Sequence, residues 1–180
     1  NMGVTAVGAL SPEQNIASPD KKTREAGLER LKWTIDMAEA ANVEVICGPF
    51  HSTFALFTRQ PPTLQEKQWS NEMLYKAAEY AQKANIVLTP EAVNRFECYL
   101  YNTMADLGSM VQEVNHPNLG AMFDTHHANI EEKSQGQAIR TIAPHLKHVH
   151  ISENDRGTPG SGQVHWDEVF AALKEIKYDG

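Results

Sequence analysis

Five short apolar segments alternate with longer amphipathic segments along the chain. The apolar segments cover residues 4–10, 43–48, 86–89, 119–124 and 146–152. Nearly every position in them is apolar, which is typical of parallel strands that are covered on both faces. The pattern therefore predicts five strands of a parallel sheet.

The segments between these strands carry apolar residues at helical spacing. Intervals of three and four residues place the members of each group on one face of a helix. We expect the first helix to open at Ser18-Pro19 and Thr103 to cap the third. The four groups are Leu28, Leu31, Ile35 and Ala38; Leu74, Ala77, Ala78 and Ala81; Met104, Leu107, Val111 and Val114; and Trp166, Val169, Phe170 and Leu173.

Strands that alternate with helices indicate βαβ units with right-handed crossovers. Two architectures fit this order, an open doubly wound sheet and part of an eight-stranded barrel. A dinucleotide-binding sheet needs a glycine-rich phosphate loop after a strand, and none of the five segments is followed by one. A barrel instead gathers functional residues at the C-terminal ends of several strands. Glu91 follows the third segment, Asp124 closes the fourth and His150 lies near the end of the fifth, so the sequence favours an α/β barrel.

Composition and charge narrow the range of partners and compartments. The 180 residues are 41% hydrophobic, enough for one buried core, and we expect residues 1–180 to form a single domain. The apolar runs are far shorter than the ~20 residues that cross a bilayer, so no membrane partner is expected. A formal charge of −7 argues against nucleic acid. Cys47 and Cys98 do not resemble a disulfide framework, which predicts free thiols and a cytoplasmic location.

The residues at the strand ends suit a metal site. Glu91, Asp124 and His150 offer two carboxylates and one imidazole, an oxygen-rich set that fits Mn²⁺, Mg²⁺ or Co²⁺ better than a thiolate-bound zinc. Each of them could be an ordinary loop residue when taken alone. Their equivalent positions after three successive strands favour a common site.

Three more polar residues follow at short spacing. Glu97 lies six residues after Glu91, His127 three after Asp124, and Arg156 six after His150. Polar groups near a divalent cation suit a polyhydroxylated substrate that has a carbonyl. An ordinary ion pair of Glu97 with Arg156 or with Arg95 is the alternative.

Three motifs in this region carry a family resemblance. The segments EAVNRFECYLYNT, MFDTHHANIEE and HVHISENDRGTPGSGQVHWDEV resemble the ketose 3-epimerases, which include D-tagatose and D-psicose 3-epimerases of the xylose isomerase-like TIM barrels. The elements E-x-x-N-R-F-E, D-T-x-H-x-N-I-E-E and H-x-x-E-x-x-R, in that order, are highly specific. The likeness extends from Val4 to Gly180, with Gly48-Pro49 as a weaker match.

The resemblance implies a role for each matching residue. Glu91, Asp124 and His150 would bind the divalent metal, which is Mn²⁺ in the family, with Co²⁺ or Mg²⁺ often accepted. Glu91 would also be one of two carboxylates that exchange the proton at C3 of a ketose. The substrate would be held by Glu97, His127 and Arg156. A sugar substrate and a homo-oligomer, either a dimer or a tetramer, are implied as well.

The chemistry of epimerisation explains the need for two carboxylates. One group removes a proton next to the ketone, and a second returns a proton to the other face through an enediolate, whose charge a cation can stabilise. In the family, the second glutamate is also the fourth metal ligand and follows a motif like the YDG that ends this sequence. A complete barrel has about 250 residues. We therefore expect residues 1–180 to be truncated at both ends, to supply about five of eight βα units and not to complete epimerisation alone.

Departures from the family pattern keep other functions open. His126 stands where relatives usually carry an aromatic residue, and we interpret it as a packing residue. The run from Phe50 to Phe57 would form the wall at the far end of the sugar, or else simply pack in a loop. Inosose dehydratases and hydroxypyruvate isomerases share the barrel and a similar metal set. A catalytically inactive sugar-binding domain is the remaining alternative.

Overall fold

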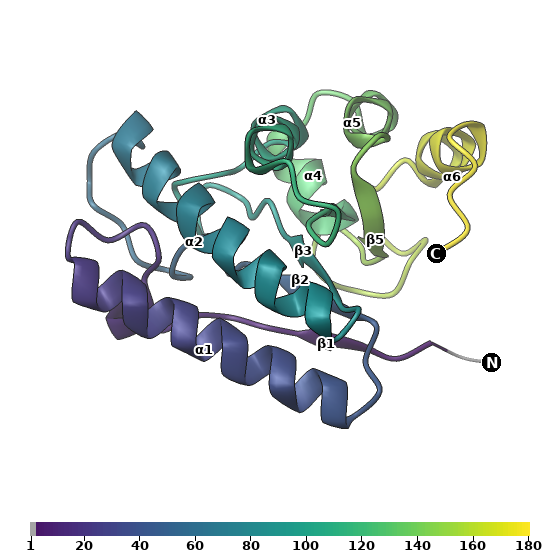
Figure 1. Ribbon diagram of the computed structural model, residues 1–180. Coiled ribbons are helices and arrows are strands. Elements are labelled where there is room, and N and C mark those ends of the chain that lie inside the picture. The colour runs from purple at the N-terminus through teal and green to yellow at the C-terminus, as the bar shows by residue number, and fades with distance from the viewer. Residues whose placement is uncertain (1–2) are drawn as a thin grey trace.

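The described part of the chain, residues 3–180 of a computed structural model, contains five parallel strands in chain order (Figure 1). Strands β1, β2 and β3 form one sheet, and β4 and β5 form a second. Isolated parallel bridges from Leu88 to Leu119 and from Glu91 to Met122 join the two sheets. The strands are β1 (Thr5–Val7), β2 (Val45–Gly48), β3 (Val87–Pro90), β4 (Ala121–Asp124) and β5 (Leu146–His150). Four of them lie within segments that the sequence predicted as strands, and β3 extends one residue beyond its predicted segment, to Pro90.

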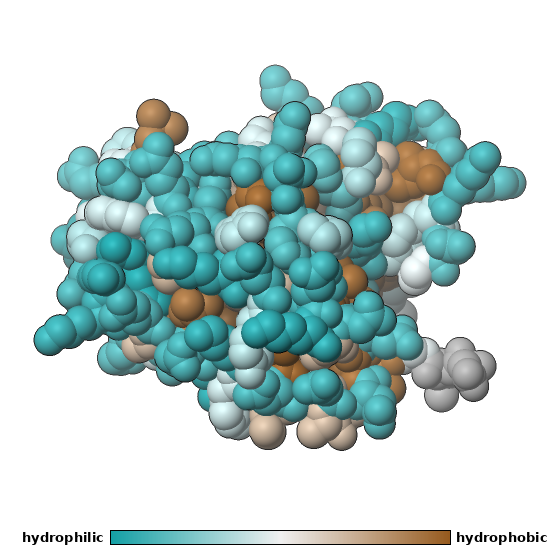
Figure 2. All heavy atoms as spheres, in the orientation of Figure 1, coloured by the Kyte–Doolittle hydropathy of each residue, from teal (hydrophilic) through white to brown (hydrophobic). Residues whose placement is uncertain are grey.

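Helices cover one side of this strand array. Helix α1 packs against α2, α2 against α3, α3 against α5 and α5 against α6, so the helical layer follows the strand order. Figure 2 shows a mostly hydrophilic surface over α1 and α2. In the described residues, no helix combines the length and apolar character needed to cross a membrane. The helices are α1 (Lys21–Ala40), α2 (Leu64–Lys83), α3 (Met104–Val114), α4 (Thr125–Glu131), α5 (Gln135–Ile142) and α6 (Trp166–Glu175), with a 3₁₀ turn at Pro12–Gln14.

Side-chain caps set the starts of the helices. Asp20 caps α1 by accepting a hydrogen bond from Thr23 N, so the helix begins slightly after the predicted Ser18-Pro19. Thr103 caps α3 through Asp106 N, as predicted. Such caps satisfy backbone N–H groups that have no partner within the helix.

The two faces of the strands have different surroundings. One face contributes Ile46, Leu88, Ala121 and Phe123 to the apolar core shared with the helices. Residues aligned across parallel strands point to the same face, because side chains alternate along each strand. The opposite face therefore carries Val7, Cys47 and Thr89 on the first sheet and Met122, Asp124, His148 and His150 on the second. This second face leads to the predicted site.

Candidate metal and sugar site

The three predicted metal ligands lie at the same end of the strand array. Asp124 and His150 are the last residues of β4 and β5 and are paired in register, and Glu91 directly follows β3. The backbone N–H of Glu91 donates to the carbonyl of Gly48, at 2.9 Å. Gly48 has φ +124°, and a Cβ there would lie 2.4 Å from the carbonyl oxygen of Gly8. Only glycine fits this contact, which helps to fix the strand end that holds Glu91.

Four titratable side chains converge at this end. Ligand atoms of Glu91, Asp124 and His127 all lie within 4.8 Å of one another. His127 Nε2 is 3.4 Å from Glu91 Oε1, and His150 Nδ1 is 3.6 Å from Asp124 Oδ2. The structure thus brings His127 into the carboxylate pair and places His150 on the other side of Asp124.

Hydrogen bonds determine which nitrogen of His127 carries the proton. Its Nδ1 accepts from the backbone N–H of Asn94 at 3.1 Å and lies 2.9 Å from Asn94 Nδ2. A backbone N–H can only donate, so Nδ1 is unprotonated and the proton of the neutral ring lies on Nε2. Burial lowers the pKa of His127, which keeps the ring neutral. Nε2–H therefore points at Glu91 as a hydrogen-bond donor, not as a free metal ligand.

The two carboxylates differ in their affinity for a proton. Burial and the negative charge of Asp124 raise the pKa of Glu91 from 4.5 to about 7. Burial also acts to raise the pKa of Asp124. The hydrogen bond with His150, the electrostatic interaction with His127 and the N–H of His126 lower it by more, so the pKa of Asp124 lies below its ordinary value. One carboxyl thus titrates near neutrality while its neighbour stays ionised, as acid–base sites with paired carboxylates require.

Asp124 also has a structural role. It is the N-cap of α4, and its Oδ1 accepts from the backbone N–H of His126 at 2.7 Å and of His127 at 3.4 Å. The second oxygen, Oδ2, is directed to His150. The two histidines therefore lie in the first turn of α4, a helix that the sequence pattern did not predict.

His126 turns away from the carboxylates. It is buried, and its Nδ1 lies 2.8 Å from the carbonyl oxygen of Asn154 in the loop after β5. A carbonyl only accepts, so His126 donates this bond. The interpretation of His126 as a packing residue is therefore incomplete, because the side chain also ties α4 to that loop.

Two of the three predicted substrate-binding residues, Glu97 and Arg156, form an ion pair at the rim. Arg156 Nη2 lies 2.7 Å from Glu97 Oε1, and Arg95 pairs with Glu131 at 2.7 Å. The alternative in which Glu97 pairs with Arg156 is therefore realised, and the one with Arg95 is not. Contact of Glu97, His127 and Arg156 with a sugar stays a prediction.

A buried carboxylate organises the loop that carries Arg156. Glu153 is fully buried and accepts from Gly160 N at 2.7 Å, Val164 N at 3.1 Å and Trp166 Nε1 at 2.6 Å. Burial acts to raise its pKa, but these hydrogen bonds lower the pKa to about 2. The motif that contains Glu153, H-x-x-E-x-x-R, did not predict a role for this residue. Its buried charge only becomes evident once the loop has folded around it.

The donor set at the strand ends fits a divalent cation. Glu91 and Asp124 are buried carboxylates whose negative charges repel each other. A cation between them would replace this repulsion with attraction. His127 directs an N–H at the group, so His150 Nδ1, next to Asp124, is the better nitrogen ligand. Two oxygens and one imidazole are typical of Mn²⁺, Mg²⁺ or Co²⁺ sites, as the sequence predicted.

Comparisons with known proteins agree with this arrangement. A sequence model of the xylose isomerase-like TIM barrel matches residues 1–180. The chain belongs to this family. The resemblance to its ketose 3-epimerases is confirmed by relatives of that name, and the fold is the α/β barrel of the family, represented here by five strands.

Several family members are similar over nearly the whole chain. D-psicose 3-epimerase of Agrobacterium fabrum is 34% identical over 99% of this chain and 63% of its own length. Ketose 3-epimerase of Arthrobacter globiformis is 33% identical over 99% of this chain and 62% of its own length. A crystal structure of D-psicose 3-epimerase in the presence of D-fructose gives a TM-score of 0.94 at 34% identity, covering 99% of this chain and 62% of that one. The chain thus spans about three fifths of the length of these relatives.

Proposed function

We propose that this site exchanges the proton at C3 of a free ketose with the help of a divalent cation, as part of a ketose 3-epimerase. The observation that carries the proposal is that Glu91 and Asp124, at the ends of the adjoining strands β3 and β4, converge with His127 of α4 within 4.8 Å. Similarity to relatives named D-psicose and ketose 3-epimerases supports the substrate class. Glu91, Asp124 and His150 would hold the cation, with Mn²⁺ as the first candidate and Co²⁺ or Mg²⁺ as alternatives. Bound there, it would act as a Lewis acid that stabilises negative charge developing on the sugar.

Glu91 is the residue suited to move the proton. A general base works best when its pKa lies near the working pH. Burial and Asp124 raise the pKa of Glu91 to about 7 in the metal-free protein, which would offset the lowering of this pKa by a bound cation. The residue is 6% exposed, which limits competition from water. We expect Glu91 to take the C3 proton from one face of the sugar. Inversion requires a second acid on the opposite face.

His127 and the rim ion pair would hold the sugar. The Nε2–H of the neutral His127 can donate to a sugar oxygen that lies beside Glu91. At the rim, Arg156 can donate a hydrogen bond to a hydroxyl oxygen of the sugar, and Glu97 can accept one from a hydroxyl group. Their side chains are 53% and 21% exposed there. A dimer or tetramer stays a prediction.

Hydrogen exchange at C3 tests this proposal directly. The protein is incubated with D-fructose and Mn²⁺ in heavy water, and loss of the C3 proton signal is followed by NMR. We expect exchange with the unaltered protein and none with Glu91→Gln. Glu175→Gln is the matched control and should exchange normally. It changes an exposed glutamate on α6 that pairs with Arg140 on α5. Exchange that persists in Glu91→Gln would contradict the assignment of the base.

The binding-module alternative gives a different result in the same assay. Such a protein would be stabilised by Mn²⁺ against thermal unfolding but would leave the C3 proton in place. Any Mn²⁺-dependent exchange therefore excludes it. Comparison of D-fructose with an inosose separates the epimerase from an inosose dehydratase.

A further inference from the structure

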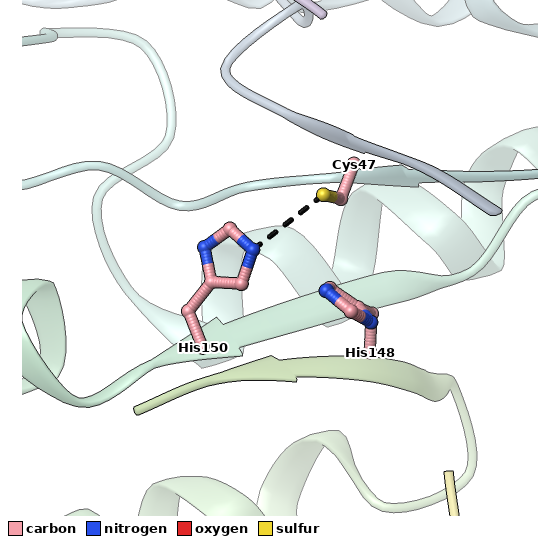
Figure 3. A group of neighbouring side chains, drawn as sticks. All are labelled: Cys47, His148 and His150. Atoms are coloured by element: carbon pink, nitrogen blue, oxygen red, sulfur yellow. Dashed lines mark hydrogen bonds between the residues drawn. The ribbon is translucent and has the colours of Figure 1, made fainter. Parts of the chain in front are cut away.

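A second group of metal-binding side chains lies on the interior face of the strands, next to the proposed cation site. Cys47 on β2 and His148 and His150 on β5 each present one ligand atom, and these atoms lie within 4.8 Å of one another. Cys47 lies 101 positions before His148 and 103 before His150 in the sequence. Figure 3 shows the three side chains facing one another across the interior. The described residues contain one other such group, formed by Glu91, Asp124 and His127.

The geometry of this group resembles a metal site. Cys47 Sγ is 3.6 Å from His150 Nε2. Two ligands of a tetrahedral zinc ion lie about 3.5 Å apart, given bond lengths near 2.3 Å to sulfur and 2.1 Å to nitrogen. One ring nitrogen of His148 is turned toward the gap between the sulfur and His150 (Figure 3). Since the three ligand atoms lie within 4.8 Å of one another, they could bind one ion together and leave a fourth position for water.

We propose that Cys47, His148 and His150 form a site for a thiophilic metal ion such as Zn²⁺ or Cd²⁺. One thiolate and two imidazoles favour such ions over Mn²⁺ or Mg²⁺, which prefer oxygen ligands. The thiol of Cys47 gives up its proton to solvent on binding, as metal-bound cysteines do. Cys47 is fully buried, whereas His148 and His150 are partly exposed.

The shared residue His150 couples this site to the proposed cation site. Its Nδ1 faces Asp124 Oδ2 at 3.6 Å and its Nε2 faces the Cys47 sulfur. A neutral imidazole has one unprotonated nitrogen, so it can bind a metal through only one of them. A thiophilic ion on Nε2 places the ring proton on Nδ1 and removes that nitrogen from the other site. The two ions therefore compete, a consequence that rests on the proposed function.

Cadmium binding tests the site independently of catalysis. Cd²⁺ is titrated into the metal-free protein, and the ultraviolet sulfur-to-cadmium charge-transfer band is measured. The chain has two cysteines, which makes Cys98→Ser the matched control for Cys47→Ser. We expect a band that saturates at one ion per chain in the unaltered protein and in Cys98→Ser, and loss of the band in Cys47→Ser. A band that survives in Cys47→Ser or disappears in Cys98→Ser would overturn the proposal.

His148→Gln provides a second test that keeps the thiol. This variant should bind Cd²⁺ at least tenfold more weakly, since loss of even an outer group weakens metal sites by about 10- to 100-fold. Unchanged Cd²⁺ affinity would remove His148 from the site and contradict the proposal. The folded state of each variant is verified by circular dichroism before titration.

Competition is measured by electron paramagnetic resonance of Mn²⁺. Added Cd²⁺ should release Mn²⁺ from the unaltered protein at concentrations that leave it bound in Cys47→Ser. Equal release from both proteins would contradict the coupling through His150, because it would indicate direct replacement at the carboxylates. If Mn²⁺ does not bind before Cd²⁺ is added, that result contradicts the proposed function and not the Cys47 site. The charge-transfer band would then still test the Cys47 site.

Discussion

Replacement of Glu91 by glutamine should stabilise the metal-free protein at alkaline pH while removing its proposed activity. Glu91 is buried beside the ionised Asp124, and both effects favour its neutral form. Glutamine has nearly the same shape, is always neutral, and its amide oxygen can still accept from His127 Nε2. The substitution therefore removes an unfavourable charge and leaves the surrounding contacts largely intact.

The size of the effect follows from the pKa. The pKa of Glu91 is 4.5 in the unfolded chain and about 7 in the folded protein. The folded state thus binds the proton more tightly, and stability falls as pH rises from about 4.5 to about 7. Each pKa unit corresponds to about 1.4 kcal/mol, so the ionised Glu91 lowers the free energy of unfolding by about 3 kcal/mol above pH 7. At pH 5 the loss is below about 1 kcal/mol, because this pH is only about half a unit above the pKa in the unfolded chain.

Urea unfolding in the presence of a chelator measures this difference. Glu91→Gln should exceed the unaltered protein in unfolding free energy by about 3 kcal/mol at pH 8 and by less than about 1 kcal/mol at pH 5. Mn²⁺ should reverse the order, since it would stabilise only the protein that binds it. Glu175→Gln should show neither effect. A variant that is less stable at pH 8, or one whose gain is the same at both pH values, would refute the reasoning.

Further substitutions separate the roles of the remaining site residues. Asp124→Asn should abolish Mn²⁺ binding measured by calorimetry and, since an amide oxygen still caps α4, should leave the helical circular dichroism signal. His127→Ala should weaken sugar binding at least tenfold and retain Mn²⁺, whereas His126→Phe should retain both but increase proteolysis of the loop after β5, because its bond to Asn154 is lost. Glu153→Gln should lower the melting temperature and increase proteolysis of the same loop. In the unaltered protein, the stabilisation that ionised Glu153 provides should be lost as pH falls from 4.5 toward 2, because Glu153 becomes protonated there.

The strands and long helices could be predicted because their burial leaves a periodic pattern. Two short helices could not. Helix α4 has seven residues, fewer than the window in which a 3.6-residue period can be recognised, and it begins directly after the last residue of β4. Helix α5 contains Gly136, which normally argues against a helix. A Cβ at Gly136 would lie 2.8 Å from the Cγ of Glu168 on α6, so close helix packing explains the glycine.

The site was predictable where it depends on strand ends and not where it depends on loops. Glu91 and Asp124 follow from the rule that parallel strands present their C-terminal residues at one edge. The orientation of His127 depends on α4 and on Asn94, neither of which the spacing reveals. The proximity of Cys47 to His150 depends on how β2 and β5, which are not neighbours in the strand order, face each other in the folded chain.

The buried charge of Glu91 links the stability of this protein to its proposed chemistry. In the absence of a cation, two carboxylates repel each other in a place with little water, and the folded state is destabilised. A divalent ion would replace that repulsion with attraction, so the free energy lost in the empty site becomes part of the affinity for the metal. Metal binding should therefore stabilise the protein most above pH 7, where Glu91 is ionised, and progressively less as Glu91 takes up a proton. The burial and charge that weaken the metal-free fold thus favour the metal-bound state, in which the proposed proton exchange would occur.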